Sequence, residues 1–219
     1  MELRIDHTDD HRIQFVLKGA TDAFANSIRR TLLCDVDALA ISSVEFYRNT
    51  TAFPDEIIAH RLGMLPLRDS MIENASYTMH IREYDGDVFS DAILPVAGEY
   101  PCVLPGVFIV PMQHDQGLHL KAYARRGLPS EHARYGTCVA PAYAIRHDGV
   151  TEEECICDRT ERVARCENCG HMPANKDLSQ RELVHWFTFE TTGVPPMVLL
   201  NRALGVLHSN LTGLMLALS

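Results

Sequence analysis

Leucines recur at heptad spacing over the last part of the chain, and this pattern constrains the fold most. Successive leucines are four, three, four, three and four residues apart, and Met197 lies three residues before the first. They are Leu200, Leu204, Leu207, Leu211, Leu214 and Leu218. Two apolar positions per heptad form a narrow stripe that packs against another helix. The sequence therefore predicts a terminal helix that packs either in its own domain or against a partner.

Size and charge narrow the function classes. The chain has 219 residues, 46% of them hydrophobic, which is enough for one large or two small domains with a real core. Its net charge is −9. Proteins that bind nucleic acid extensively are usually basic, because Lys and Arg contact the phosphates. We therefore expect little direct DNA contact.

No membrane contact is expected. The terminal apolar stretch contains Asn201, Arg202 and His208, which would be costly in hydrocarbon. The first eleven residues are strongly charged and do not look like a signal peptide. These observations predict an intracellular protein.

Apolar alternation predicts several strands, and helical spacing predicts few helices, so the expected fold class is α+β. Expected strands cover residues 3–5, 13–17, 41–47, 79–81, 118–123 and 184–189, with an irregularity at Ser42 and Ser43. A helix capped by Thr21 or Asp22 follows the second strand. Residues 131–142 have no clear period, so we expect a loop there.

A second helix has strong sequence signals at both ends. Pro54 suits the first helical position, because the N–H that proline lacks would be unpaired there. Asp55 and Glu56 place negative charge at the positive end of the helix dipole. Gly63 fits a left-handed stop, and Pro66 prevents continuation.

Four cysteines within fifteen residues indicate a metal site. Cys155 and Cys157 form one pair, and Cys166 and Cys169 form a second. Four thiolates at this spacing suit a tetrahedral, structural Zn²⁺ that closes a loop. An iron–sulfur cluster and free surface thiols are the alternatives, and His171 is an alternative ligand.

No familiar catalytic set accompanies this cluster. The chain lacks a Gly-x-Ser-x-Gly, a P-loop and a His-Glu-x-x-His motif. These absences favour an assembly protein over a free metal-dependent or Cys-nucleophile enzyme, which is kept as an alternative.

Three segments resemble a known family. They are residues 24–31 (FANSIRRT), 55–67 (DEIIAHRLGMLPL) and 124–135 (ARRGLPSEHARY). They are similar to the alpha-like subunit of multisubunit DNA-directed RNA polymerases, in particular the third-largest subunit of eukaryotic RNA polymerase II and its archaeal counterpart. Residues 187–193 and the terminal helix resemble that family's closing strand and helix. The form is expected to be divergent, from a viral or protist lineage.

The resemblance implies a discontinuous dimerisation domain, with an antiparallel sheet and two helices, into which a mainly-β domain is inserted. The dimerisation domain would cover residues 1–50 and 178–219, and the inserted domain residues 51–177, including the cysteine cluster. The eukaryotic relative usually has its zinc cysteines soon after the Leu-Pro-Leu segment, but residues 68–84 contain none. The zinc prediction therefore depends on the spacing of the four cysteines alone.

The implied function is a non-catalytic assembly subunit. It would form a heterodimer with a smaller related subunit and so provide the platform for the two large catalytic subunits. Small zinc-binding polymerase subunits are further implied partners. The implied interface residues are Phe24, Ile28, Arg29, Arg30, His60, Arg61, Glu131, His132, Arg134 and the six leucines of the terminal helix.

Two other interpretations stay open. The chain could be a zinc-stapled scaffold protein that associates with itself, or a free enzyme. For the polymerase subunit the expected compartment is the nucleus, with the cytoplasm or the virion as the alternatives for a viral form.

Overall fold

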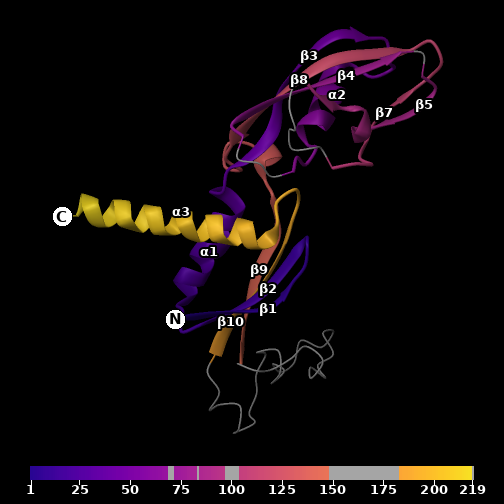
Figure 1. Cartoon of the computed structure of the whole chain (residues 1–219). Helices are drawn as coiled ribbons and strands as arrows, with labels where there is room; N and C mark the ends of the chain where they lie inside the picture. Colours follow the sequence, from indigo (N-terminus) through magenta and orange to yellow (C-terminus); the bar gives the residue numbers. More distant parts are fainter. Residues whose placement is uncertain (69–71, 83, 97–103, 148–182, 219) are drawn as a thin grey trace, which may run out of the picture. The chain divides into compact units, whose positions relative to one another are not determined.

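The computed structural model describes residues 1–68, 72–82, 84–96, 104–147 and 183–218 (Figure 1). The chain divides into two compact units. The first unit comprises Met1–Leu32, Cys138–Glu190 and Pro196–Ser219, and the second comprises Leu33–Thr137 and Thr191–Pro195. Both contain antiparallel sheets and at least one helix, so the predicted α+β class is confirmed.

The first unit is built on a four-stranded sheet. Its strand order is β1 (Glu2–Thr8), β2 (Arg12–Lys18), β10 (Leu183–Thr191) and β9 (Cys138–His147). Strand β2 pairs antiparallel with both β1 and β10. Phe15 lies opposite Phe187 in this register, and their rings stack with centroids 4.7 Å apart. These stacked rings join the strands at the centre of the core, because both are fully buried.

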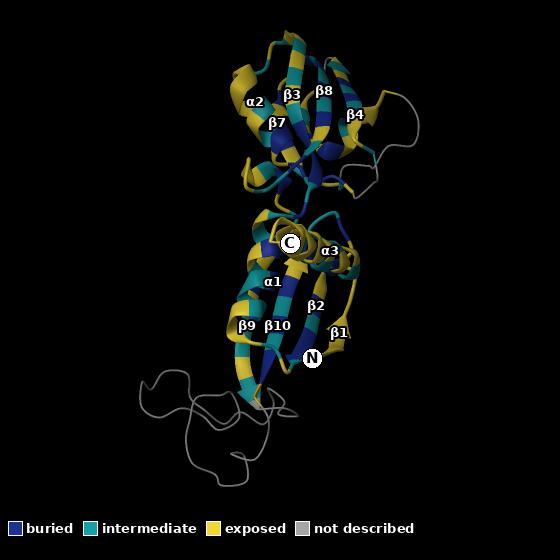
Figure 2. Ribbon diagram, turned by 90° about the vertical axis from the view of Figure 1, so that its left-hand side faces the viewer, coloured by how far each residue is buried: buried dark blue, intermediate teal, exposed yellow. Residues whose placement is uncertain are grey.

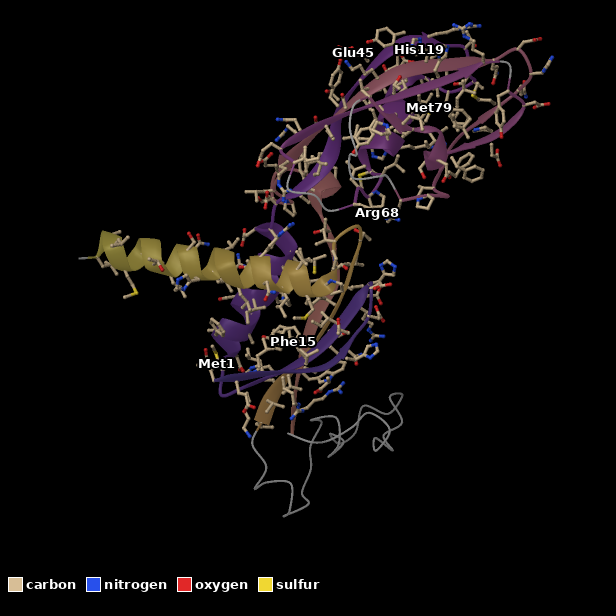
Figure 3. The ribbon with its side chains drawn as sticks, in the orientation of Figure 1. Met1, Phe15, Glu45, Arg68, Met79 and His119 are labelled. Carbon is tan, nitrogen blue, oxygen red and sulfur yellow. The ribbon has the colours of Figure 1, made fainter. Side chains whose placement is uncertain are left out.

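Helices α1 (Asp22–Cys34) and α3 (Pro196–Ala217) lie on one side of this sheet (Figure 1). Figure 3 shows Phe15 on the side that faces them. At the start of α1, Thr21 Oγ1 accepts a hydrogen bond from the Phe24 amide at 3.3 Å. This bond confirms the predicted cap, because a threonine oxygen satisfies one of the free N–H groups of a first turn.

The second unit is also built on a four-stranded sheet, and α2 (Asp55–Gly63) packs against it. The order is β3 (Ala38–Asn49), β8 (Gly117–Gly127), β4 (Asn74–Arg82) and β6 (Leu94–Pro95). Strands β5 (Gly86–Phe89) and β7 (Phe108–Met112) form a separate two-stranded ribbon, and η1 (Ser90–Ala92) and η2 (Ala133–Tyr135) are short 3-10 turns. Ile58, Leu62, Met79 and Leu120 are fully buried between these elements.

The predicted ends of the second helix were wrong in detail. Pro54 has an extended backbone (φ −66°, ψ 157°), so the helix begins one residue later, at Asp55. Gly63 lies inside the helix, and the chain leaves it at Met64 without a left-handed residue (φ −92°, ψ 1°). The Met64 amide donates to the carbonyls of both His60 and Arg61, so a tightened last turn ends the helix instead.

The expected loop at residues 131–142 was also wrong in part. Strand β9 begins at Cys138 and continues through this stretch. Ala140 has φ 48° and Pro141 follows it, so the apolar alternation that marks a strand is interrupted there. The irregularity expected at Ser42 and Ser43 is confirmed, because the register between β3 and β8 shifts between Ile41 and Ser43.

The compact units divide the chain at other positions than the predicted domain boundaries. Strand β3, which we assigned to the dimerisation domain, pairs with β8 in the second unit. The boundaries at residues 50 and 178 stay a prediction. Within the part of the chain that is described, no helix combines the length and hydrophobicity that crossing a bilayer requires.

A close backbone approach fixes the segment just before α3. Gly193 has φ +75°, and a Cβ atom placed on it would lie 2.0 Å from the Leu67 carbonyl oxygen. Only glycine fits such a conformation and such a contact. Residues 191–195 therefore pack tightly in the second unit.

Candidate subunit interface

The leucine stripe of α3 changes from buried to exposed along the helix. Leu200 is 2% exposed, and Leu204 and Leu207 are half-buried. Leu211, Leu214 and Leu218 are 53%, 61% and 87% exposed. Figure 2 looks onto the exposed C-terminal end of this helix. Only the N-terminal part of the stripe therefore packs within the described chain.

Further apolar residues widen the exposed part of α3. Met215 and Leu216 are each 73% exposed. On the neighbouring sheet, Leu3 and Ile5 of β1 are each 38% exposed and lie on the same face as Leu17 and Phe15, their partners across the ladder. The sequence pattern of Leu3 and Ile5 does not predict an interface role for them. Their short alternation indicates a strand but not which strands stay uncovered.

Helix α1 places its predicted interface residues in different environments. Ile28 is fully buried and so packs within its own unit, whereas Phe24 is half-buried. Arg29 is half-buried, and its Nη2 donates to Asn26 Oδ1 at 2.9 Å, one turn earlier. Arg30 is exposed. Arg30 is thus the fully accessible member of this set, and Phe24 and Arg29 are accessible in part.

Arg134 joins two of the family-like segments. Its Nη1 donates to the carbonyls of Ile41 (2.9 Å) and Ser42 (3.1 Å), at the point where the β3 register shifts. Its Nε lies 3.2 Å from His132 Nδ1. A Cβ added to Gly63 would lie 3.6 Å from Arg134 Nη1, so the end of α2 is also in contact. The arginine thus donates to two carbonyls at the irregular point of the ladder.

Arg61 is held inside the second unit in a similar way. Its guanidinium donates to the Ile109 carbonyl and lies over the rings of Phe53 and Phe108, 5.2 and 5.4 Å from their centroids. Such contacts hold the side chain in place and stabilise its positive charge within the second unit. Arg61 therefore has a structural role within the second unit, and its interface role stays a prediction.

The other predicted contacts of the second unit are accessible. His60, Glu131 and His132 are exposed, and Glu131 forms an ion pair with Arg125 at 3.3 Å. Gly127 is required beside them, because a Cβ there would lie 2.6 Å from the Tyr135 ring. The part of the third segment that follows β8 thus places His132 and Glu131 at the surface.

The predicted metal ligands Cys155, Cys157, Cys166 and Cys169, with His171, lie outside the described residues. Within the described ranges, no three His, Cys, Asp or Glu side chains are grouped as a metal site would need. Burial raises the pKa of Cys138 to about 12. Its thiolate is therefore scarce near neutral pH, which disfavours it as a nucleophile.

Comparison with known proteins defines the class. Residues 14–211 match the RNA polymerase Rpb3/Rpb11 dimerisation domain. DNA-directed RNA polymerase subunit Rpo3 of Pyrococcus furiosus is 37% identical over 159 residues, which cover 67% of this chain and 61% of that protein. Rpo3 of Methanosphaera stadtmanae is 30% identical over 226 residues, covering 83% of this chain and 81% of that protein.

A more distant relative is eukaryotic. The conjugation stage-specific protein of Tetrahymena thermophila is 23% identical over 193 residues, covering 70% of this chain and 62% of that protein. The chain spans less than two thirds of the Pyrococcus and Tetrahymena proteins.

This chain belongs to the RNA polymerase Rpb3/Rpb11 dimerisation domain family. The resemblance to an alpha-like polymerase subunit is thereby confirmed.

Proposed function

We propose that this chain is a non-catalytic assembly subunit of a DNA-directed RNA polymerase. It pairs with a smaller related subunit, and the heterodimer is the platform for the two large catalytic subunits. Family membership and the names of the archaeal relatives support this assignment. The observation that carries it is the exposed half of α3, where Leu211, Leu214 and Leu218 continue a packing stripe beyond the chain's own core.

Physical chemistry favours covering this helix. Burying a leucine or methionine side chain contributes roughly 1.5–3 kcal/mol. A contiguous exposed apolar patch of this kind is typical of protein–protein contacts. A helix from the smaller subunit, packed along the stripe at heptad spacing, would remove these side chains from water.

Contacts to the other subunits are assigned to accessible residues. His60, Glu131 and His132 in the second unit are exposed, and so is Arg30 in the first. They are proposed to face the large catalytic subunits and the small zinc-binding subunits. The net charge of −9 supports little direct contact with DNA.

Zinc binding and location are further parts of the proposal. Four thiolates at the spacing of Cys155, Cys157, Cys166 and Cys169 suit a structural Zn²⁺. The subunit would act where its polymerase acts, in the nucleus for a eukaryotic enzyme and in the cytoplasm or virion for a viral one.

The test is purification of the tagged full chain from its native source, followed by native mass measurement. Wild type should carry a smaller subunit and the large polymerase subunits. Leu214→Asp should lose them, because a carboxylate would be buried in the seam. Ser209→Asp adds the same charge off the stripe of the same helix and should keep the assembly.

Two outcomes would contradict the proposal. A homodimer without polymerase subunits would favour the self-associating scaffold. Retention of the smaller subunit by Leu214→Asp would show that the stripe is not the contact.

A further inference from the structure

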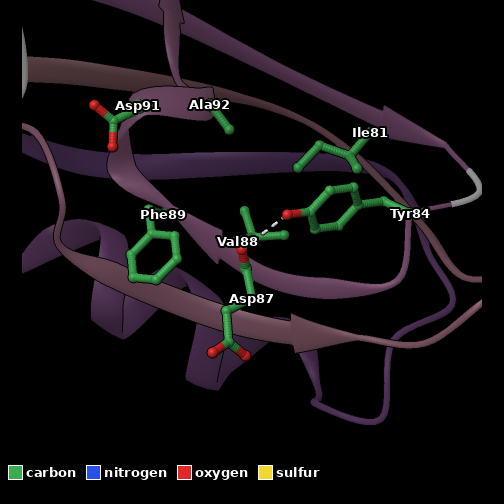
Figure 4. Close-up of a pocket in the computed structure, with 7 residues that line it drawn as sticks. All are labelled: Ile81, Tyr84, Asp87, Val88, Phe89, Asp91 and Ala92. Carbon is green, nitrogen blue, oxygen red and sulfur yellow. Dashed lines mark hydrogen bonds between the residues drawn. The ribbon is translucent and has the colours of Figure 1, made fainter.

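A cavity of about 300 Å³ lies beside the β5–β7 ribbon of the second unit. Ile81, Tyr84 and Val88 form apolar walls, and Phe89, Asp87 and Asp91 also line it (Figure 4). Val88 is buried at its base, whereas Tyr84 and Phe89 are 44% and 41% exposed. Two aromatic side chains that line the cavity are therefore accessible to solvent.

Apolar surface continues around the cavity. Phe108 is 42% exposed, and its ring meets that of Phe89 edge to face with centroids 6.1 Å apart. Exposed apolar groups gathered around a cavity are typical of a protein-binding surface, whereas scattered ones are ordinary.

The residues around the cavity are held in place before any partner binds. Tyr84 donates its hydroxyl to the Asp87 carbonyl at 3.3 Å. Asp91 Oδ2 accepts from the Gly106 amide at 2.9 Å. Ser90 Oγ donates to the Leu104 carbonyl at 2.6 Å and accepts from the Val107 amide. A surface fixed in this way loses little conformational entropy on binding.

The charges on the cavity indicate which kind of side chain fits. Asp87 and Asp91 are exposed carboxylates beside apolar walls. Arginine and lysine match this arrangement, because their aliphatic stems pack on apolar surface while their charged ends reach a carboxylate. A polyanion such as nucleic acid would be repelled.

We propose that this surface docks a partner protein segment in which an arginine or lysine stands next to a large apolar side chain. The basic stem would enter the cavity along Tyr84 and Val88, and its cationic end would pair with Asp87 or Asp91. The apolar neighbour would cover Phe89 and Phe108. This docking surface is independent of the terminal helix, because every residue in it belongs to the second unit.

The test uses the full chain with labelled isoleucine and valine methyl groups and two synthetic probes. These are the peptide amides acetyl-Leu-Arg-Leu-Arg and acetyl-Leu-Glu-Leu-Glu. The arginine peptide should shift the NMR signals of Ile81 and Val88, and the glutamate peptide should bind at least about tenfold more weakly, as expected for repulsion by two carboxylates. Equal affinities would overturn the proposal.

Charge reversal provides the matched control. The double variant Asp87→Lys and Asp91→Lys should reverse the preference between the two peptides. Asp10→Lys makes the same change at an exposed aspartate of the first unit and should leave it unchanged. Displacement of the arginine peptide by single-stranded DNA, or concentration-dependent shifts of Ile81 and Val88 without peptide, would identify a different occupant and overturn the proposal.

Discussion

Helices α2 and α3 use apolar residues in different ways. The nine residues of α2 bury Ile58 and Leu62 completely against their own unit. The 22 residues of α3 bury Leu199, Leu200 and Ala203 near its start and leave Leu211 and the leucines beyond it exposed. A helix can thus complete the core of one unit or extend past it.

Length is the physical reason for the difference. At 1.5 Å per residue, α2 is about 13 Å long and α3 about 33 Å. A short helix can be covered along its whole length by the sheet on which it packs. In α3, the apolar stripe continues for several turns beyond the last fully buried position.

The loss of stability on truncating an apolar side chain should differ most clearly between the two helices. Ile58→Ala should lower the free energy of unfolding by about 2–5 kcal/mol, because it leaves a cavity in a filled core. Leu214→Ala in the isolated chain should change it by less than about 0.5 kcal/mol, because this leucine is 61% exposed. Urea unfolding followed by circular dichroism measures both. Similar losses would show that α3 is covered by its own chain.

A glycine of the second unit and a glycine of α3 offer a second comparison. Gly193→Ala should destabilise the protein by about 2–3 kcal/mol, since the new Cβ meets the Leu67 backbone and φ is positive. Gly205→Ala on α3 adds the same methyl group in open space and should be neutral or stabilising by up to about 1 kcal/mol. Thermal unfolding of both variants checks the contrast. Equal effects would refute the close approach at Gly193.

A smaller loss of stability is expected when Arg134, in the turn that supports α2 and β3, is substituted. Arg134→Gln should cost about 1–2 kcal/mol, because the Ile41 and Ser42 carbonyls lose their donor. Arg125→Gln removes an exposed ion pair with Glu131 and should cost less than about 1 kcal/mol. Hydrogen exchange in β3 should accelerate in the first variant only. Unchanged exchange in Arg134→Gln would exclude this supporting role.

The predictions from sequence succeeded where the signal is local and strong. The alternation around Phe15 and Phe187, and the cap at Thr21, identified elements that the structure contains. The predicted helix start at Pro54 and stop at Gly63 were wrong. Hydrogen bonds to nearby backbone carbonyls, as in the tightened last turn of α2, decide where a helix begins and ends. Strand β9 escaped prediction because Ala140 and Pro141 interrupt its pattern.

The interface residues stay a prediction, and the structure adds internal roles for two of them. Arg61 and Arg134 looked like contact residues in the motif, yet both donate to carbonyls of their own unit. Charged residues in a motif therefore do not reveal whether they face a partner or hold a turn. The cavity beside Tyr84 could not be foreseen, because its walls come from separate strands and a turn.

The amino-acid sequence alone determined the family, the α+β class and the presence of a long leucine-striped helix, because motifs and periodicity are properties of the linear chain. Only the tertiary structure decided which leucines are buried and which are exposed. It also decided that two arginines donate to carbonyls of β3 and β7. Burial depends on which elements meet in space, and residues far apart in the chain set that contact.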